Sequence, residues 1–223
     1  MTTHDEHGVP GDQPKNPHLE RRLHELDAPR NPDESTKERI LRVSAQLFAA
    51  KGFHGTGLTE LSEAIGLGRG GLYHHIHSKD QLHAEIAFAP IRAAVGEAGR
   101  IIESSRSPVQ KMEDLSLALA AAIRDSMNEW IVFFREFSSL PPKDQAGILE
   151  LRVRYLDCWR AVIADGVHDG FFNDEDPVFL DGLLPLFIYA HIWETNRESA
   201  TPLAAGESLA RFILRGLSNH SQP

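Results

Sequence analysis

From Ser35 onward, apolar residues recur at intervals of three and four, the spacing that places them on one face of a helix. Ile40, Val43 and Leu47 show the pattern first, and Lys51-Gly52 ends that run. No segment alternates apolar and polar residues as a half-buried strand does. The pattern predicts an all-α fold of nine helices, three of them short and early: 35–51, 58–65, 69–76, 78–104, 107–127, 128–138, 141–165, 176–196 and 201–216.

Several helix boundaries are signalled by capping residues and prolines. Ser78 and Gln81 have the spacing of a capping box. Ser107 precedes Pro108, as an N-cap precedes a proline in the first turn. Pro90 falls inside the helix 78–104, where we expect a kink. Residues 166–173 are expected to form a loop.

Composition sets the first 34 residues apart. They hold five of the thirteen prolines and no long apolar periodicity, so we expect a mobile N-terminal tail over 1–34. No secretory signal is visible there, which makes a cytoplasmic protein the default expectation. The longest clean apolar run, residues 183–190, is too short to span a membrane.

Charge changes sign along the chain. The net charge is −9, yet residues 35–83 carry six basic and four acidic side chains. The parts on either side, 1–34 and 84–223, are both acidic. A small basic segment on an acidic body is typical of a module that faces nucleic acid.

Cofactor, metal and catalytic motifs are not found in the sequence. A single cysteine, Cys158, excludes an internal disulfide framework. His74 and His75 are adjacent and cannot share a helix face, so we expect DNA contact or packing there rather than a metal site. No spacing of a nucleophile or of a paired acid and base is present.

Two of the short helices suggest helix-turn-helix geometry, because the turn Gly66-Leu67-Gly68 joins them. Apolar residues can hold the second of these helices against the first: Leu61, Ile65, Leu67, Leu72 and Ile76. Phe48 and Phe53, from the helix before them and its end, can complete this small core. The outer face of the second helix then carries Arg69, Gly70, Gly71, Tyr73 and His74. Arginine can fork onto guanine, and tyrosine and histidine can reach phosphates or base edges. Thr56, Thr59 and Lys79 lie at helix starts, which favour phosphate.

The run FAAKGFHGTGLTELSEAIGLGRGGLYHHIHSKDQL is similar to the DNA-binding domain of tetracycline-repressor-type (TetR family) regulators, over residues 40–85. The Gly-Phe-x-Gly-Thr start, the Leu-Tyr-His-His close and the Ser-Lys-Asp-Gln-Leu opening of the next helix all fit. The resemblance implies a homodimer on a palindromic double-stranded DNA operator and an effector pocket in a C-terminal bundle. Residues 35–83 are then the helix-turn-helix DNA-binding domain, and 84–220 the ligand-binding and dimerisation domain.

Three glycines depart from the family pattern. Gly57 and Gly68 stand where the family often has a hydroxyl N-cap, and Gly71 replaces a small residue that often contacts DNA. Because glycine inside a helix costs roughly 0.5–1 kcal/mol relative to alanine, we expect the recognition helix to be less ordered without DNA.

Aromatic residues recur at helical spacing in the C-terminal half. They form either plain core or the lining of a pocket. The candidate ligand-binding residues are Trp130, Phe134, Phe137, Arg152, Tyr155, Trp159, Phe187 and His191. The last two helices carry apolar residues that the resemblance assigns to the dimer interface: Leu183, Leu209, Phe212, Ile213 and Leu217.

Residues 135–172 resemble the C-terminal domain of TetR-type regulators that sense acyl-CoA or related thioesters. Such a ligand needs an apolar slot for its acyl part and cations for its phosphates, which Arg124, Arg135, Arg152 and Arg154 could supply. Alternatively, these arginines pair with neighbouring carboxylates, and a smaller apolar effector uses the slot alone.

The sequence therefore predicts a ligand-responsive, sequence-specific DNA-binding regulator, a repressor released by an apolar or acyl-CoA-type effector. The alternatives are an activator or dual regulator of the same family, or an enzyme built on a helical bundle.

Overall fold

The computed structural model describes residues 34–173, 180–182, 185–187, 189 and 202–217. Eight α-helices and one 3-10 helix lie within these residues: α2 (Thr36–Lys51), α3 (Leu58–Ile65), α4 (Arg69–His75), α5 (Lys79–Glu103), α6 (Pro108–Asp125), α7 (Met127–Arg135), η2 (Phe137–Ser139), α8 (Pro142–His168) and α10 (Pro202–Leu217). Further helical residues occur between 180 and 189, and no strand is present in the described part of the chain. The all-α prediction is confirmed. The expected tail, apart from Glu34, and most of the expected helix 176–196 lie outside the described residues.

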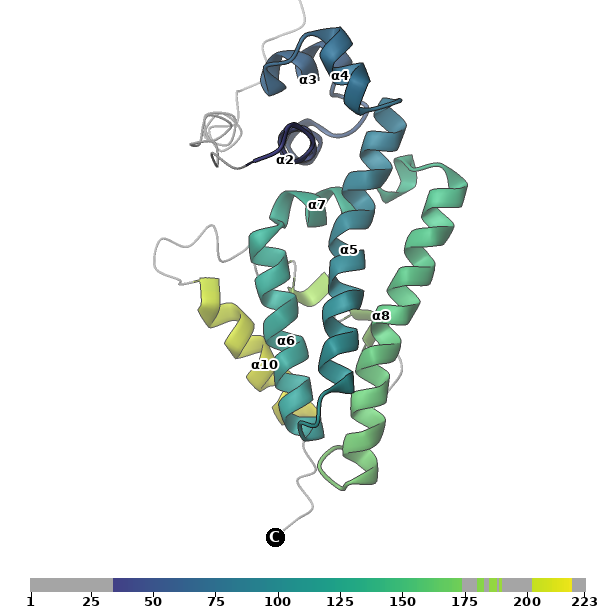
Figure 1. Cartoon of the computed structure of the whole chain (residues 1–223). Helices are drawn as coiled ribbons and strands as arrows, with labels where there is room; N and C mark the ends of the chain where they lie inside the picture. The colour runs from purple at the N-terminus through teal and green to yellow at the C-terminus, as the bar shows by residue number, and fades with distance from the viewer. Residues whose placement is uncertain (1–33, 174–179, 183–184, 188, 190–201, 218–223) are drawn as a thin grey trace, which may run out of the picture.

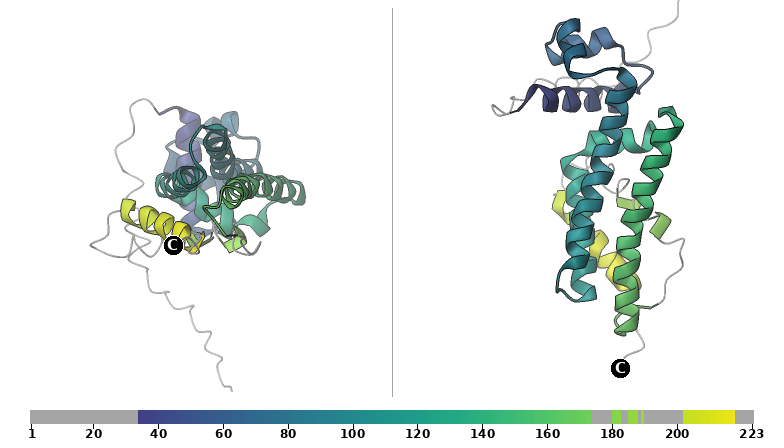
Figure 2. Two further views of the ribbon diagram at one scale, coloured as in Figure 1. Left: turned by 90° about the horizontal axis from the view of Figure 1, so that it is seen from below. Right: turned by 45° about the vertical axis from the view of Figure 1, so that its right-hand side comes forward.

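The helices form two parts, a small domain and a bundle, arranged along one long axis (Figure 1). α2, α3 and α4 make a small domain at one end, and α5 runs from it into a bundle with α6, α8 and α10. α7 lies between the two parts and contacts both α2 and α5. Figure 2 shows α5, α6 and α8 running side by side through the bundle. α5 is therefore the covalent link between the small domain and the bundle, and α7 is a second, non-covalent link.

Capping side chains define several helix starts. Ser35 with Glu38, and Ser107 with Gln110, form reciprocal capping boxes that satisfy the free N–H groups at the starts of α2 and α6. At α5, the Ser78 hydroxyl accepts a hydrogen bond from the Gln81 amide at 3.0 Å. The Gln81 side chain, however, accepts from the backbone N–H of His77 at 3.2 Å, so the second half of the predicted box is displaced by one residue.

α8 is longer than its sequence pattern predicts. It continues through Gly166, which was expected to open a loop, and ends at His168. The chain then folds back, and the N–H groups of Phe171 and Phe172 donate to the Gly166 carbonyl at 2.8 and 3.1 Å. A Cβ atom added to Gly166 would lie 2.0 Å from Cδ2 of Phe172. This glycine thus makes room for an aromatic ring and does not break the helix.

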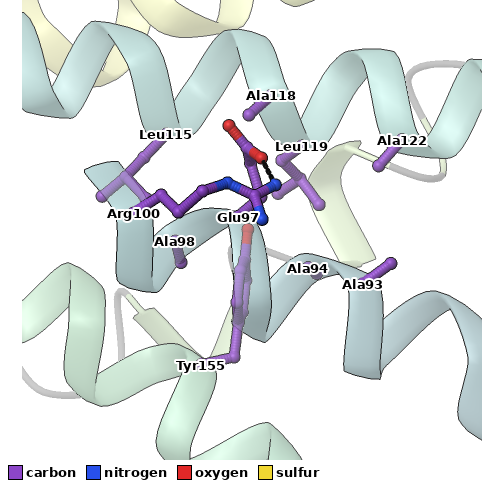
Figure 3. Close-up of a pocket in the computed structure, with 10 residues that line it drawn as sticks. All are labelled: Ala93, Ala94, Glu97, Ala98, Arg100, Leu115, Ala118, Leu119, Ala122 and Tyr155. Carbon is purple, nitrogen blue, oxygen red and sulfur yellow. Dashed lines mark hydrogen bonds and ion pairs between the residues drawn. The ribbon is translucent and has the colours of Figure 1, made fainter. Parts of the chain in front are cut away.

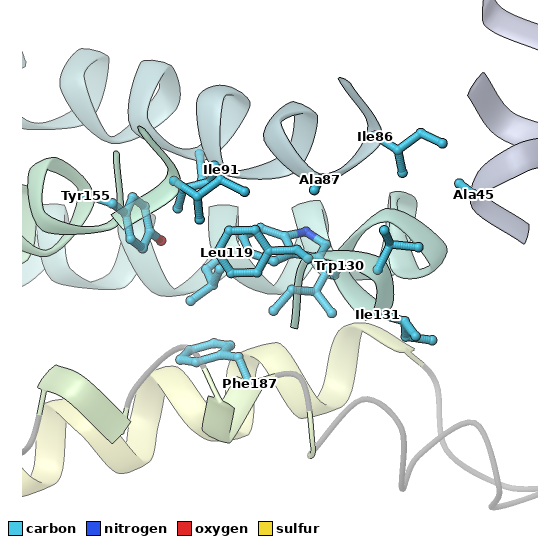
Figure 4. Close-up of a cluster of buried hydrophobic side chains, with 14 of the residues drawn as sticks. Ala45, Ile86, Ala87, Ile91, Leu119, Trp130, Ile131, Tyr155 and Phe187 are labelled. Carbon is cyan, nitrogen blue, oxygen red and sulfur yellow. The ribbon is translucent and has the colours of Figure 1, made fainter. Parts of the chain in front are cut away.

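One continuous cluster of buried apolar side chains extends from the small domain into the bundle. Its largest members include Trp130, Trp159 and Phe48, each fully buried. Figure 4 shows part of it, with Trp130 of α7 among residues of α5, α6 and the 180–189 segment. Because the core is shared, a change of packing in the bundle has a path of contacts to the small domain.

Candidate DNA-binding surface and effector cavity

α4 is seated on the small domain by the apolar residues that the sequence predicts. Leu61, Ile65, Leu72 and Ile76 are all at most 2% exposed, while Leu67 is partly buried. α3 ends at Gly66, whose φ of 73° is in the left-handed region that glycine adopts most readily. The short turn that follows sets α4 across α3, in the arrangement of a helix-turn-helix (Figure 1).

The outer face of α4 is open to solvent. Arg69, Gly70, Gly71, Tyr73 and His74 are all exposed, as the sequence predicts. Gly68 is the N-cap and supplies no side-chain hydrogen bond to the first turn. A Cβ atom at Gly70 would have no neighbour within 4 Å, and at Gly71 only the Leu67 side chain. Glycines without side chains therefore surround Arg69 and lie close to Tyr73 on this surface.

The three predicted phosphate contacts differ in their placement. Thr59 is exposed in the first turn of α3. Thr56 is 1% exposed, and its hydroxyl donates to the Gly52 carbonyl at 2.9 Å, so this side chain stabilises the turn before α3. Lys79 lies partly buried with its Nζ 4.2 Å from the centre of the Phe53 ring. Burial lowers the pKa of this lysine from its ordinary value.

Ion pairs neutralise half of the basic residues in 35–83. Lys37 pairs with Glu85 at 2.6 Å, Arg42 with Glu34 at 2.7 Å, and Lys51 with Glu60. Among the described residues, the other three cations, Arg39, Arg69 and Lys79, make no ion pair. Of these three, Arg69 alone is exposed, and it lies on the outer face of α4.

His83, which the sequence analysis did not single out, lies beneath this surface. It is fully buried, and its ring stacks on Phe53 with 4.4 Å between ring centres. Neither ring nitrogen has a hydrogen-bond partner within the described structure. Burial disfavours the charged imidazolium and lowers the pKa of His83 to about 4.

A cavity of about 240 Å³ lies between α5 and α6 and is closed on the third side by Tyr155 of α8. Figure 3 shows the Tyr155 ring pointing from α8 toward the α5 residues Glu97 and Arg100, which form an ion pair. The rest of the lining is small and apolar: Ala93, Ala94, Ala98, Leu115, Ala118, Leu119 and Ala122. Full burial raises the pKa of the Tyr155 phenol. The cavity suits a small apolar group with one polar end near Arg100.

Of the predicted ligand-binding residues, Tyr155 lines this cavity. Trp130, Trp159 and Phe187 are at most 2% exposed and belong to the core cluster. Phe137 is partly buried against that cluster, and Phe134 is 36% exposed. His191 lies outside the described residues. The sequence spacing placed aromatic residues in the bundle but could not show that alanines make up half of the ten residues lining the cavity, and Tyr155 is the one aromatic among them.

The arginines proposed to hold phosphates do not line the cavity. Arg152 pairs with Asp181 at 3.1 Å, and Arg124 pairs with its neighbour Asp125. Arg135 donates to the Ala49 carbonyl of the small domain at 3.0 Å. Arg154 is exposed on α8. Arg100 does line the cavity, but the aromatic pattern does not indicate it, because Arg100 lies on α5, outside the aromatic stripes.

The predicted dimer residues are divided by the packing of α10 on α6. Ile213 and Leu217, four residues apart, are at most 1% exposed and face this chain's own core. Phe212 is 62% exposed, and Leu209 is partly buried. Leu183 lies outside the described residues. Among the described residues predicted for the dimer interface, Phe212 is therefore the exposed one that can contact a second copy of the chain.

Two further properties concern the described residues alone. None of their helices is both long and apolar enough to cross a membrane. They also contain no group of three histidine, cysteine or acidic side chains placed to hold a metal ion.

Comparisons with known proteins agree with this architecture. The family "Bacterial regulatory proteins, tetR family" matches residues 40–86, and "Tetracyclin repressor-like, C-terminal domain" matches residues 105–217. The HTH-type transcriptional repressor KstR2 of Mycolicibacterium smegmatis is 26% identical over 86% of this chain and 95% of its own length.

Solved structures show the same fold. The TetR family regulator PfmR from Thermus thermophilus is 25% identical, with a TM-score of 0.73 over 81% of this chain and all of its own. KstR2 of Mycobacterium tuberculosis is 20% identical, with a TM-score of 0.76 over 84% and 97%. AibR in complex with isovaleryl coenzyme A and operator DNA is also 20% identical, with a TM-score of 0.70 over 80% and 97%. On the helix-turn-helix, the bundle and these matches together, the chain belongs to the TetR family of bacterial DNA-binding transcriptional regulators.

Proposed function

We propose that this protein is a dimeric transcriptional repressor that binds a palindromic operator and is released by an apolar effector, of the acyl-CoA class, bound at the α5–α6–α8 cavity. The cavity beside α5 carries the proposal, because α5 leads directly into the recognition helix. The relatives that are named repressors, and the fold match to a regulator bound to isovaleryl coenzyme A and DNA, support it. The protein then acts by binding and not by catalysis, in the bacterial cytoplasm and at the nucleoid when it holds DNA.

α4 is the proposed reading element. Arg69 is the exposed cation on its face and is the residue suited to fork onto a guanine. Tyr73 and His74 lie beside it, and Thr59 and Lys79 are proposed phosphate contacts. Gly70 and Gly71 offer backbone alone, so we assign side-chain readout mainly to Arg69 and Tyr73.

Selection of bound duplexes from random DNA tests the reading element. The wild-type protein is expected to recover a two-fold symmetric sequence with half-sites about one turn apart, roughly 34–36 Å. Arg69→Ala should lower affinity for that sequence by about 1–3 kcal/mol and relax preference at one base pair of each half-site. Glu63→Ala, a control on the exposed face of α3, should leave base preference unchanged. An Arg69→Ala variant that recovers the same sequence with the same strength would contradict the assignment.

A panel of ligands tests the effector class. The 240 Å³ cavity admits a short acyl group while the coenzyme remains outside, near Arg100. Isovaleryl-CoA and other short-chain acyl-CoA thioesters are expected to raise the melting temperature of the protein and to release the selected duplex. Free CoA and the free acids should act weakly, because each supplies one part of the ligand. Release by an uncharged aromatic compound, with no response to any thioester, would reject the CoA class and retain the cavity.

The thioester must bind the DNA-free conformation more tightly than the DNA-binding conformation. A ligand with equal affinity for both would not shift the equilibrium between them. The measured ratio of operator affinities with and without ligand therefore reports the coupling directly. A transcription assay on the selected operator separates the repressor from the activator alternative.

A further inference from the structure

The short helix α7 makes two polar contacts with the helix-turn-helix domain at one place. The backbone N–H of Phe53 donates to Oε2 of Glu136 at 3.2 Å. The guanidinium of Arg135 donates to the carbonyl of Ala49 at 3.0 Å. Glu136 is only 9% exposed, although it carries a carboxylate. Two adjacent side chains at the end of α7 thus hold the last turn of α2 and the residue that follows it.

The backbone conformation explains why an acceptor is needed there. α2 ends at Gly52, which has a φ of 81° and turns the chain so that the next N–H leaves the helix. A buried N–H without a partner destabilises the fold, and Glu136 supplies that partner from another part of the fold. The position of α7 therefore fixes the position of this turn.

Phe53 links the contact with Glu136 to α5, the helix that follows the recognition helix. Its ring stacks on His83 at 4.4 Å and lies 4.2 Å below the ammonium of Lys79, both in the first turns of α5. α5 begins four residues after the end of α4. A movement of the Phe53 turn is accordingly a movement of the support on which α4 rests.

At its other face, α7 is part of the bundle core. Trp130 and Phe133 are at most 4% exposed and pack in the cluster that also contains Leu119, a residue lining the cavity (Figure 4). Between α2 and the α6–α7 junction, by contrast, lies an open groove of about 770 Å³. α2 packs on α7 and is tied to it by these polar contacts at its C-terminal end, whereas Glu38, Leu41 and Arg42 in its N-terminal half border open space. This is the arrangement of a helix that can pivot about its C-terminal end.

We propose that Glu136, assisted by Arg135, is the positioning residue that couples the effector bundle to the helix-turn-helix domain, by holding the Phe53 turn at the end of α7. The response to an effector rests on the proposed function, whereas the role of Glu136 in holding the small domain on the bundle does not. Loss of the Glu136 carboxylate should leave both domains folded, but the small domain should then adopt a wider range of orientations relative to the bundle. Glutamine keeps an oxygen that accepts from the Phe53 N–H, so Glu136→Gln should behave as wild type.

A distance measurement tests the pivot without any ligand or DNA. Spin labels are attached to Glu63→Cys in α3 and Glu113→Cys in α6, both exposed, in a Cys158→Ser background, and the labelled chain is diluted with unlabelled protein. Electron–electron double resonance should give a narrow distance distribution for wild type and Glu136→Gln. Glu136→Ala should broaden it, and Glu150→Ala, which removes an exposed carboxylate of α8, should not. A narrow distribution in Glu136→Ala would overturn the proposal.

A second measurement tests coupling. Isovaleryl-CoA and butyryl-CoA are the probes, and the duplex recovered by selection is the DNA. In Glu136→Ala, thioester affinity should stay within about threefold of wild type, while the wild-type loss of operator affinity, at least about tenfold, should fall below threefold. A full response in this variant would overturn the proposal. If wild type responds to neither thioester, the proposed effector class fails, and the distance distributions still decide the role of Glu136.

Discussion

At the scale of single residues, the small domain depends on a few side chains that the helical pattern does not reveal. Thr56 has the spacing of a phosphate contact, yet its hydroxyl is satisfied inside the turn after α2. His83 occupies an apolar face and is buried without a hydrogen bond. The sequence gives the residue type at such positions, but not whether its polar atoms find a nearby partner, as in Thr56, or are buried without one, as in His83. His83 nevertheless has a property that can be measured.

We expect His83 to make the stability of the fold depend on pH. Its pKa is about 4 in the folded protein and about 6.5 in an unfolded chain. Below pH 6.5 the unfolded chain takes up a proton that the folded protein does not, so stability falls as the pH drops from 6.5 toward 4. Between pH 7 and pH 5 the loss should be about 2 kcal/mol.

Urea unfolding at the two pH values measures this loss. His83→Leu keeps an apolar side chain of similar size and removes the titration, while Glu136, Asp80, Lys79 and His54, whose charges act on His83, remain. The difference between wild type and variant then isolates the histidine. Equal pH dependence in the two proteins would show that His83 is not buried in its neutral form.

At the scale of elements, the helical pattern predicted most of the boundaries to within a few residues. α2, α3 and α4 were predictable because each combines a clear apolar face with capping or glycine signals. The end of α8 was not, since Gly166 has the composition of a helix stop and acts as a seat for Phe172. The expected helix 128–138 is likewise divided into α7 and η2 at Glu136, whose carboxylate accepts a hydrogen bond from the Phe53 N–H.

The candidate sites follow the same rule. The exposed face of α4 was predictable from spacing alone, because the apolar residues that seat it leave one side open. The cavity was not, because alanines on α5 and α6 line it and alanine at helical spacing carries no signal of a cavity. Tyr155 was predictable because the aromatic spacing marks it whether it packs in the core or lines a cavity.

At the scale of the whole molecule, α10 distinguishes residues that build the chain from residues that can join two chains. Ile213 and Leu217 pack inward against the core, whereas Phe212 is exposed on the opposite side of the helix. A large exposed aromatic on a helix that packs on only one side is a candidate anchor for a partner. We therefore expect the dimer to depend on Phe212.

Phe212→Asp should raise the dimer dissociation constant at least about tenfold, because it places a charge where an aromatic ring is buried between subunits. Analytical ultracentrifugation measures the dissociation constant, and circular dichroism should show unchanged helix content. Ile213→Asp is the matched comparison, since a charge in the core should unfold α10 itself. A fully dimeric Phe212→Asp protein would move the interface to other exposed apolar residues, such as Leu149 and Val153 of α8.

The placement of the helix-turn-helix at one end of an elongated body has an electrical consequence. Residues 35–83 are net positive and residues 84–173, which lie in α5 to α8 of the bundle, are net negative, so within these described residues charge of opposite sign is separated along the long axis. Such a molecule has a permanent dipole moment, and the field of a DNA duplex exerts a torque on it before any contact forms. The torque turns the small domain toward the phosphates and the bundle away. Added salt shortens the reach of this alignment to about 10 Å at 0.1 M, so fewer encounters then begin in the productive orientation.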